Sequence, residues 1–215
     1  MAYFPFYIDI SKKTFLIVGG GRVAQEKVNR LRRFTEDIIV IAPETAIAPE
    51  TTQTTAHSTG TLRVLRREYR EEDLDMADYV VAATGIREVD RRVAEDCRRR
   101  GIPVNVVDDR DYCDFIFPAI VKRGDLTVAV STGGTSPAYA RQLRQEIEAM
   151  LPPEIEGILA RMGEVRGEAA ERISDQKNRA AFYKKLLTEL IAGGNTTTEE
   201  EIRSIIEAFS DGDRK

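Results

Sequence analysis

The sequence predicts an α/β fold, with a parallel sheet followed by a small α+β unit and a C-terminal helical region. Three observations predict this fold. An apolar strand near the start runs into a glycine-rich turn and then an amphipathic segment. Short apolar runs then alternate with helical patterns, as in parallel sheets covered by helices on both faces. From Pro152 onward the apolar residues follow helical periodicity alone.

Composition and charge narrow the range of functions. The 215 residues are 42% hydrophobic and 32% charged, which is typical of a globular protein. A net charge of −4 argues against general binding to nucleic acids or anionic membranes, which need a basic surface. No apolar run approaches about 18 residues, and no basic segment precedes an apolar one at the start. We therefore expect a cytoplasmic protein without a membrane span or a signal peptide.

The first strand, turn and helix have the pattern of a dinucleotide site. The apolar strand at 14–18 runs into Gly19, which suits a tight turn, and Gly21, which lets a pyrophosphate approach the backbone. Ala24 is small enough for the next helix to pack closely on the strand. Helical periodicity continues to Phe34, and 37–43 follows as a buried strand. This βαβ unit predicts a Rossmann-like domain, and a glycine turn without a ligand is the alternative.

The remaining elements are expected in the following order. Residues 44–60, rich in Thr, Ala and Pro, form a surface excursion. Strands lie at 62–69, 79–84 and 102–108, with a helix at 89–100 that ends at Gly101. Two β-rich runs, 115–121 and 126–131, pair as a hairpin. Ser136 and Pro137 then begin a helix, as its N-cap and first residue.

Three apolar stripes predict helices in the rest of the chain. They are Ile155, Ile158, Leu159, Met162 and Val165, then Phe182, Leu186 and Leu190, then Ile202, Ile205, Ile206 and Phe209. Thr198, with Glu201 three residues later, predicts a capping box. The expected domains are a dinucleotide-binding domain at 1–112, a dimerisation unit at 113–150 and a helical domain at 151–215. A homodimer is expected because the hairpin of the middle unit would have open edges in a monomer.

Three segments together resemble one protein family. They are residues 18–24 (VGGGRVA), 105–108 (NVVD) and 131–137 (STGGTSP). The combination resembles the precorrin-2 dehydrogenase and sirohydrochlorin ferrochelatase family, the N-terminal type of sirohaem synthase. The resemblance extends through the expected dimerisation unit, and the helical tail is less distinctive.

The resemblance implies NAD-dependent oxidation of precorrin-2 to sirohydrochlorin in sirohaem synthesis. NAD is then the cofactor, the two tetrapyrroles are the small-molecule partners, and Fe²⁺ is a further substrate if the same site also makes sirohaem. No protein metal site is expected, because the tetrapyrrole supplies its own nitrogens, and His57 is expected to be exposed. A non-catalytic regulatory module that binds NAD or a tetrapyrrole is the alternative.

The same resemblance identifies residues expected to contact the cofactor. They are Gly19, Gly21, Arg22, Val23, Ala24, Pro43, Glu44, Thr84 and Asn105. Glu44 also fits the general rule that an acidic residue about 20 positions beyond the glycines binds the ribose of NAD. A carboxylate there would repel a 2′-phosphate, which favours NAD over NADP. An ordinary solvated loop residue is the alternative for Glu44.

Asp108 is, by resemblance, the acid/base residue of the family. It ends a strand at the same sheet edge as the glycine turn, where it would accept the proton lost with the hydride. Simple loop capping by Asp108 and its acidic neighbours is the alternative. The loop expected to bind a substrate carboxylate through backbone amides consists of Ser131, Thr132, Gly133, Gly134, Thr135 and Ser136. A glycine turn with an N-cap is the alternative for this loop.

Two positions depart from the family pattern. Gly85 stands where relatives usually carry Asp, and Asp90 stands where they usually carry Asn. One polar contact near the cofactor is therefore expected to differ. Gly85 is the feature that most favours the non-catalytic alternative.

Overall fold

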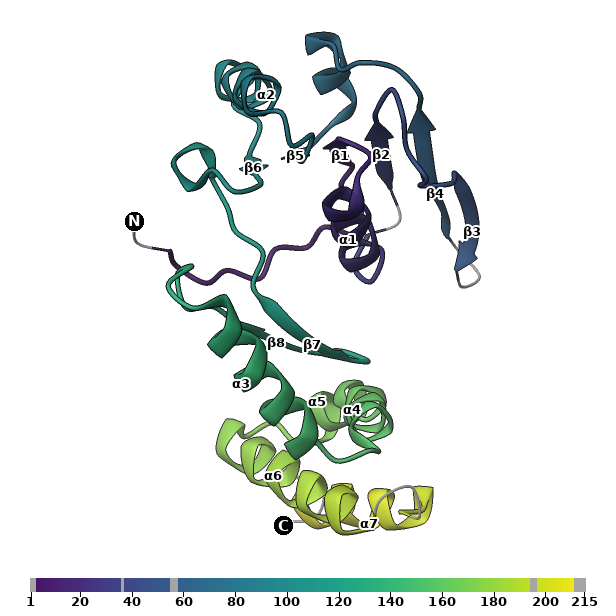
Figure 1. The fold of residues 1–215 in the computed structure, drawn as a ribbon. Helices are drawn as coiled ribbons and strands as arrows, with labels where there is room; N and C mark the ends of the chain where they lie inside the picture. Colours follow the sequence, from purple (N-terminus) through teal and green to yellow (C-terminus); the bar gives the residue numbers. More distant parts are fainter. Residues whose placement is uncertain (1–2, 36, 55–57, 194–196, 211–215) are drawn as a thin grey trace. The chain divides into compact units, whose positions relative to one another are not determined.

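A computed structural model describes residues 3–35, 37–54, 58–193 and 197–210. The chain divides into two compact units, Met1–Phe117 and Pro118–Lys215, which we describe separately (Figure 1). The expected division into three domains, with boundaries after residues 112 and 150, stays a prediction.

The first unit is built on a six-stranded sheet in the order β3-β4-β2-β1-β5-β6. Its strands are β1 (Phe15–Val18), β2 (Ile38–Ile41), β3 (Glu50–Thr54), β4 (Ser58–Leu65), β5 (Tyr79–Ala82) and β6 (Val104–Val106). All neighbouring strands are parallel except β3, which pairs antiparallel with β4 at the edge. This arrangement confirms the predicted α/β fold class.

Alternate residues of β1 point toward two separate apolar clusters. Leu16 lies in the cluster that includes Val93 and Cys97 of α2 (Arg87–Arg100). Ile17 lies in the cluster that includes Val28 of α1 (Arg22–Leu31). Both faces of the strand are therefore covered, which explains why its sequence is continuously apolar rather than alternating.

The expected surface excursion at 44–60 is wrong in its second half. That segment contains β3 and the start of β4, which begins at residue 58 and ends at Leu65 rather than spanning 62–69. Threonine is β-branched and favours the extended backbone, so a Thr-rich segment pairs readily at a sheet edge. His57 lies outside the described residues.

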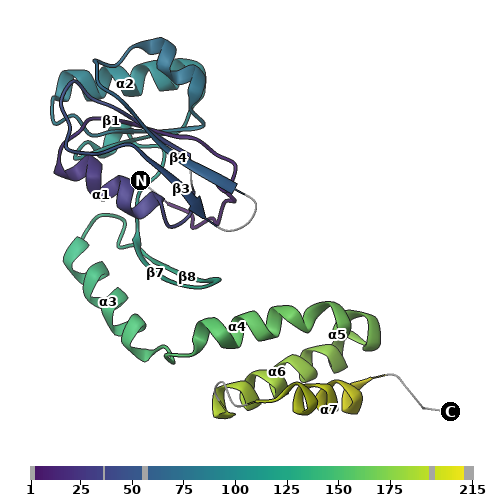
Figure 2. The same cartoon turned by 90° about the vertical axis from the view of Figure 1, so that its right-hand side faces the viewer.

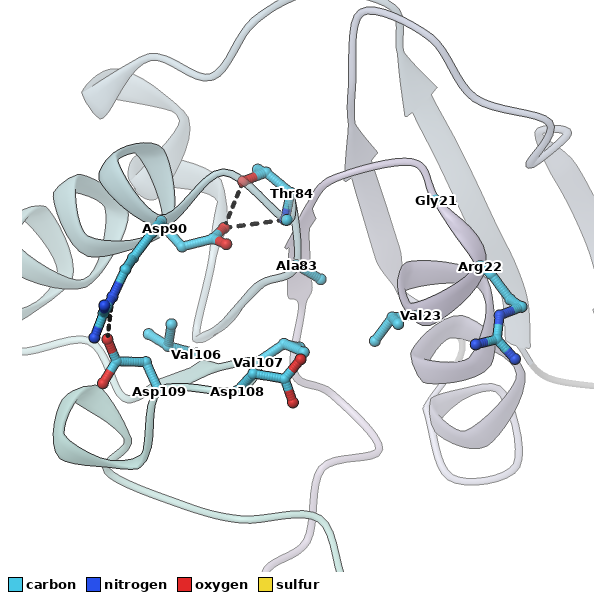
Figure 3. Close-up of a pocket in the computed structure, with 12 residues that line it drawn as sticks. Gly21, Arg22, Val23, Ala83, Thr84, Asp90, Val106, Val107, Asp108 and Asp109 are labelled. Carbon is cyan, nitrogen blue, oxygen red and sulfur yellow. Dashed lines mark hydrogen bonds and ion pairs between the residues drawn. The ribbon is translucent and has the colours of Figure 1, made fainter.

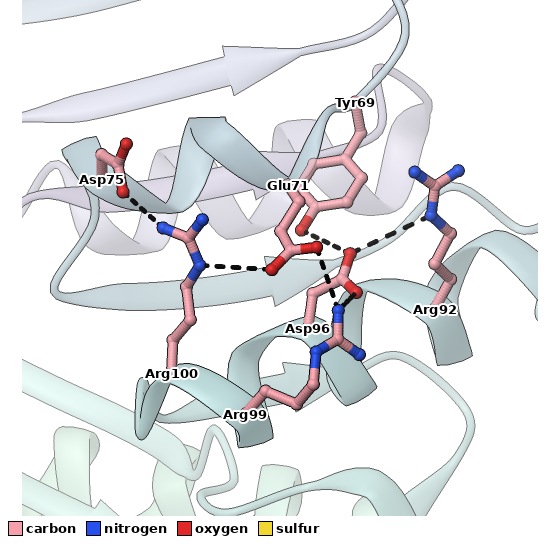
Figure 4. Close-up of polar contacts among 7 residues, drawn as sticks. All are labelled: Tyr69, Glu71, Asp75, Arg92, Asp96, Arg99 and Arg100. Atoms are coloured by element: carbon pink, nitrogen blue, oxygen red, sulfur yellow. Dashed lines mark hydrogen bonds and ion pairs between the residues drawn. The ribbon is translucent and has the colours of Figure 1, made fainter.

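A polar network ties α2 to the 3₁₀ helix at Glu71–Met76 (Figure 4). Asp96 is 3% exposed, and its carboxylate accepts hydrogen bonds from the Tyr69 hydroxyl, at 3.1 Å, and from Arg99. Arg99 also pairs with Glu71 at 3.0 Å. Burial of its ring, with the nearby Asp96 charge, raises the pKa of Tyr69. The buried carboxylate is thus compensated by hydrogen bonds and a cation.

The second unit begins with the expected hairpin. Strands β7 (Ala119–Arg123) and β8 (Leu126–Val130) pair antiparallel, with Gly124 at φ +52° in the turn. Helix α3 (Pro137–Met150) follows, and the Ser136 hydroxyl accepts a hydrogen bond from the Tyr139 amide at 3.3 Å. The predicted N-cap is therefore confirmed.

The rest of the second unit is helical (Figure 2). Its helices are α4 (Ile155–Glu164), α5 (Arg166–Arg172), α6 (Gln176–Gly193) and α7 (Glu199–Phe209). Their core contains Phe182, Leu186 and Ile206, as the apolar stripes predicted. The capping box of Thr198 and Glu201 is confirmed. Within the ranges the structure describes, no helix is both long enough and apolar enough to cross a membrane.

Candidate dinucleotide-binding site

A cavity of about 590 Å³ opens in the first unit, where β5 and β6 end and α1 begins (Figure 3). Parallel strands β1, β5 and β6 end at the same edge of the sheet, so the loops that follow them meet there. The lining consists of Gly21, Arg22, Val23, Ala83, Thr84, Gly85, Arg87, Asp90, Val106, Val107, Asp108 and Asp109.

Each of the three glycines after β1 has a different environment. Gly19 has φ +126°, and a Cβ there would lie 2.2 Å from the Ala83 carbonyl oxygen. A Cβ on Gly20 would lie 2.4 Å from the Glu44 carbonyl oxygen, whereas one on Gly21 would have nothing within 4 Å. Gly19 and Gly20 therefore permit close packing of backbone on backbone. Gly21 leaves its backbone open toward the cavity.

The beginning of α1 suits an anion. Gly21 is the N-cap, no side chain caps the helix, and its first turn contains no acidic residue. The backbone amides of such a turn, together with the helix dipole, attract phosphate groups. Arg22, the first residue of the helix, lines the cavity with its side chain 89% exposed. A close-packed glycine turn, an open Gly21 and an uncapped helix start fit a dinucleotide pyrophosphate.

The loop between β5 and α2 forms a second wall. Thr84 donates its amide and its hydroxyl to the same oxygen of Asp90, and the Ile86 amide donates to the Thr84 hydroxyl at 3.0 Å. Gly85 has φ +75°, and a Cβ there would meet nothing within 4 Å. Asp90 therefore organises the loop.

The two adjacent aspartates that follow β6 in the sequence have different surroundings. Asp109 is paired with Arg91 at 3.1 Å and with Arg87 at 3.6 Å. Asp108 lines the cavity, and its carboxylate makes no hydrogen bond or ion pair with the residues the structure describes (Figure 3). Asp108 is also the one non-glycine among the described residues with positive φ, at +60°. A side chain held in this disfavoured conformation at a cavity is typical of a functional position.

Lys27 of α1 interacts electrostatically with this aspartate and was not among the predicted site residues. Its ammonium nitrogen is 4.0 Å from the centroid of the Phe117 ring. Burial lowers the pKa of Lys27 to about 8, and Arg30 lowers it further, while the nearby charges of Cys113 and Asp108 act in the opposite direction. A half-buried cation outside the cavity lining therefore interacts electrostatically with the Asp108 carboxylate.

The structure brings five of the expected cofactor and catalytic residues together around the cavity, namely Gly21, Arg22, Val23, Thr84 and Asp108. Gly19 lies beneath the loop, against Ala83, and Ala24 packs in the core with no exposed surface. Pro43 and Glu44 are exposed just after β2 and do not line the cavity. Their roles toward the cofactor stay predictions.

Asn105 does not line the cavity. The residue is 6% exposed, and its side-chain amide nitrogen donates to the Phe115 carbonyl at 2.9 Å. It therefore holds the segment after β6 against the sheet. Contact with the cofactor stays a prediction for this residue.

The loop from Ser131 to Ser136 belongs to the second unit. Its own hydroxyls accept from its amides, since Gly133 donates to Ser131 at 3.1 Å and Ser136 donates to Thr132 at 3.0 Å. Gly133 and Gly134 have positive φ, at +60° and +81°. The glycine turn and N-cap are therefore present, and substrate binding by this loop stays a prediction.

Seven lining residues were not among the predicted site residues, although Gly85 and Asp90 were noted as departures near the cofactor. The seven are Ala83, Gly85, Arg87, Asp90, Val106, Val107 and Asp109. Most directly follow β5 or β6, so the rule that ligands bind at strand carboxyl ends would have identified them.

The fold and the site define a dinucleotide-binding α/β protein. A family model described as "Putative NAD(P)-binding" matches residues 6–119, more than half of the chain. A second, described as "Sirohaem biosynthesis protein central", matches residues 123–150. The chain belongs to the family that the first model describes, and the two matches together confirm the family resemblance seen in the sequence.

Individual relatives agree with this assignment. Siroheme synthase of Thioalkalivibrio sulfidiphilus is 37% identical over 205 residues, which are 94% of this chain and 41% of that protein. Siroheme synthase of Nitrosomonas europaea is 34% identical over 98% of this chain and 45% of its own length. The chain thus spans less than half the length of these two relatives. The solved structure of SirC, a precorrin-2 dehydrogenase, is 21% identical and has a TM-score of 0.67 over 96% of this chain and 98% of its own, which shows a shared fold.

Proposed function

We propose that this chain oxidises precorrin-2 to sirohydrochlorin, with NAD as the hydride acceptor, in sirohaem biosynthesis. The observation that carries the proposal is the unpaired Asp108 carboxylate beside the open glycine loop in one cavity. The siroheme synthase relatives and the fold shared with a precorrin-2 dehydrogenase support it.

The glycine loop and the start of α1 would hold the cofactor. Gly21, Arg22 and Val23 would contact the pyrophosphate, and Thr84 would lie at the opposite wall. Glu44 would accept hydrogen bonds from the adenosine ribose, which makes NAD the preferred cofactor. When bound, NAD would supply the acceptor for the hydride that leaves the macrocycle.

Asp108 would take up the proton that accompanies this hydride. Oxidation removes two hydrogens from the substrate, one as hydride and one as a proton, so a base must be within reach. The Asp108 carboxylate has no hydrogen-bond or ion-pair partner among the described residues, so it is available for that proton. Its backbone, fixed at positive φ, would aim the carboxylate at the bound macrocycle.

A homodimer would complete the substrate site, with the loop from Ser131 to Ser136 binding a carboxylate arm of the tetrapyrrole. Exposed apolar side chains on α3 support this, with Tyr139 57% and Met150 81% exposed. The two-stranded sheet of β7 and β8 has open edges that a second copy would cover. Sedimentation that gives only monomer at micromolar concentration would argue against the dimer.

The direct test mixes purified protein, anaerobic precorrin-2 and NAD⁺, and follows NADH and sirohydrochlorin together. We expect stoichiometric formation of both products. Asp108→Asn should bind NADH as the parent does and lose most turnover, since general bases contribute about 10² to 10⁴ in rate. A parent protein that binds NADH and the tetrapyrrole without turnover would favour the non-catalytic module instead.

Insertion of Fe²⁺ into sirohydrochlorin is a second proposed activity of the same site. The Asp108 carboxylate that favours it would accept protons from the pyrrole nitrogens as the metal enters. Sirohydrochlorin and Fe²⁺ are incubated with the parent, with Asp108→Asn and with buffer. A rate with the parent equal to that in buffer would remove this activity and leave the dehydrogenase proposal intact.

A further inference from the structure

The turn after β2 is bonded to the glycine loop on one side and to the residue after β4 on the other. We call residues 43–45 the Glu44 turn. The Thr45 hydroxyl donates to the Gly20 carbonyl at 3.0 Å and accepts from the Ile47 amide at 3.0 Å. The Arg66 guanidinium donates to the Thr45 carbonyl at 3.0 Å. The turn is therefore held at both of its sides.

The Glu44 turn packs closely against the glycine loop. A Cβ on Gly20 would lie 2.4 Å from the Glu44 carbonyl oxygen and 2.5 Å from the Thr45 Cβ. Only a glycine leaves room for this contact. The position of Glu44 is thus coupled through backbone atoms to the loop proposed to hold the pyrophosphate.

Glu44 and Arg66 follow neighbouring parallel strands at the same edge of the sheet. Strands β2 and β4 pair in parallel, and the Ala42 amide extends the pairing by donating to the Leu65 carbonyl at 3.2 Å. Arg66 therefore emerges beside the Glu44 turn.

These two side chains bring opposite charges to the place where the ribose is expected. Both are exposed. Glu44 makes no hydrogen bond or ion pair with the described residues. Arg66 donates one hydrogen bond, to the neutral Thr45 carbonyl. Since a guanidinium has five donors, Arg66 keeps most of its capacity for an anion.

The two charges have opposite preferences for the group at the ribose 2′ position. A carboxylate accepts a hydrogen bond from the 2′-hydroxyl of NAD and repels the 2′-phosphate of NADP. A guanidinium binds a phosphate through paired, charge-assisted hydrogen bonds.

We propose that Glu44 and Arg66 together set the cofactor selectivity: Arg66 positions the Glu44 turn for the ribose of NAD and becomes a 2′-phosphate site when the Glu44 charge is removed. This inference rests on the proposed dinucleotide binding. It adds Thr45 and Arg66 as positioning residues that the sequence pattern did not identify.

Binding of NADH and of NADPH is measured by titration calorimetry, which needs no tetrapyrrole and no turnover. The variants are Glu44→Gln, Arg66→Met, Arg66→Lys and the double variant Glu44→Gln/Arg66→Met. Arg63→Met is the matched control, because Arg63 is an exposed cation on β4 itself. Thermal melting verifies that each variant is folded. Glu44→Gln and Arg66→Met each keep a side chain of similar length without its charge.

In the parent we expect tighter binding of NADH than of NADPH. Glu44→Gln should raise the affinity for NADPH relative to NADH by about tenfold or more, and adding Arg66→Met should abolish that gain. Arg66→Met alone should weaken the binding of NADH by about two- to tenfold, because the Glu44 turn loses its hydrogen bond from Arg66. Arg66→Lys should restore part of the lost affinity. Arg63→Met should change neither affinity.

Two results would overturn the inference while NADH binding by the parent stands. One is a ratio of NADPH affinity to NADH affinity that is the same in Glu44→Gln as in the parent. The other is a gain in NADPH affinity that is still present in the double variant. A folded parent that binds neither dinucleotide overturns the proposed function and this inference together. The turnover assay with precorrin-2 is a separate experiment, so its failure alone leaves the selectivity result valid.

Discussion

Thr84 donates both its backbone amide and its hydroxyl to one carboxylate oxygen of Asp90, at 3.0 and 2.8 Å. Thr84 lines the cavity just after β5, and Asp90 is 5% exposed near the start of α2. The pair therefore anchors the loop of the second cavity wall to the helix. An asparagine here would have an amide oxygen that accepts the same two bonds.

Asp90→Asn should consequently change little, whereas Asp90→Ala should leave two donors of Thr84 without their acceptor. We expect Asp90→Ala to lower the free energy of unfolding by about 1 to 3 kcal/mol and to weaken NADH binding. Chemical unfolding and calorimetric titration measure the two effects. An alanine variant as stable as the parent would show that water replaces Asp90 without cost.

Two of the three consecutive glycines should have different roles, one in the stability of the fold and the other in NADH binding. Gly20→Ala should destabilise the first unit, because the new Cβ would lie within 2.5 Å of Glu44 and Thr45 atoms. Gly21→Ala should fold normally, since nothing lies within 4 Å of its Cβ. Its methyl group would instead block the approach of a pyrophosphate and weaken NADH binding. Loss of stability in Gly21→Ala with NADH affinity intact would contradict this assignment.

The first βαβ unit could be predicted from the sequence because each local signal agrees with the others. Ile17 and Ile39 lie in strands buried on both faces, so the runs are continuously apolar, and Val28 repeats at helical spacing toward the same sheet. Gly101 has φ +68° at the end of α2, where the sequence placed the helix stop. Local chemistry is enough for such features.

Other features depend on contacts between distant segments and could not be predicted. β3 forms through its pairing with β4, and its Thr-rich composition is equally typical of a turn. Lys27 follows the helical period of α1, but its contact with Phe117 joins segments far apart in the sequence. The positive φ of Asp108 likewise leaves no mark on the sequence, since aspartate is common in loops.

The backbone of Asp108 provides a stability prediction that is independent of catalysis. A backbone position at φ +60° favours glycine or asparagine. A side chain without a polar group there lowers the free energy of unfolding by about 1 kcal/mol. We expect the free energy of unfolding to decrease in the order Asp108→Gly, Asp108→Asn, Asp108→Ala. All three should lose turnover alike, because each removes the carboxylate. Urea unfolding separates them, and equal stabilities would mean that the segment relaxes to negative φ.

Lys27 should give the protein a distinctive dependence on pH. Burial lowers the pKa of Lys27 to about 8 from its ordinary 10.5, so between these values the unfolded chain binds more protons than the folded chain. The unfavourable effect of Lys27 is therefore fully present below about pH 8 and is relieved as pH rises to about 10.5. Lys27→Met keeps an apolar contact with Phe117 and removes the buried charge. We expect it to stabilise the protein at pH 7 by about 1 kcal/mol, after allowance for partial exposure and the lost cation–π contact.

The comparison that isolates this effect is the difference in unfolding free energy between Lys27→Met and the parent, measured from pH 7 to pH 10. Other titrating groups cancel in that difference, which should shrink as pH rises. Lys12→Met is the matched control, because Lys12 is an exposed lysine of the same unit. If Lys27→Met is no more stable than the parent at pH 7 and the difference is flat with pH, the ammonium is better solvated than its place beside Phe117 and Asp108 implies.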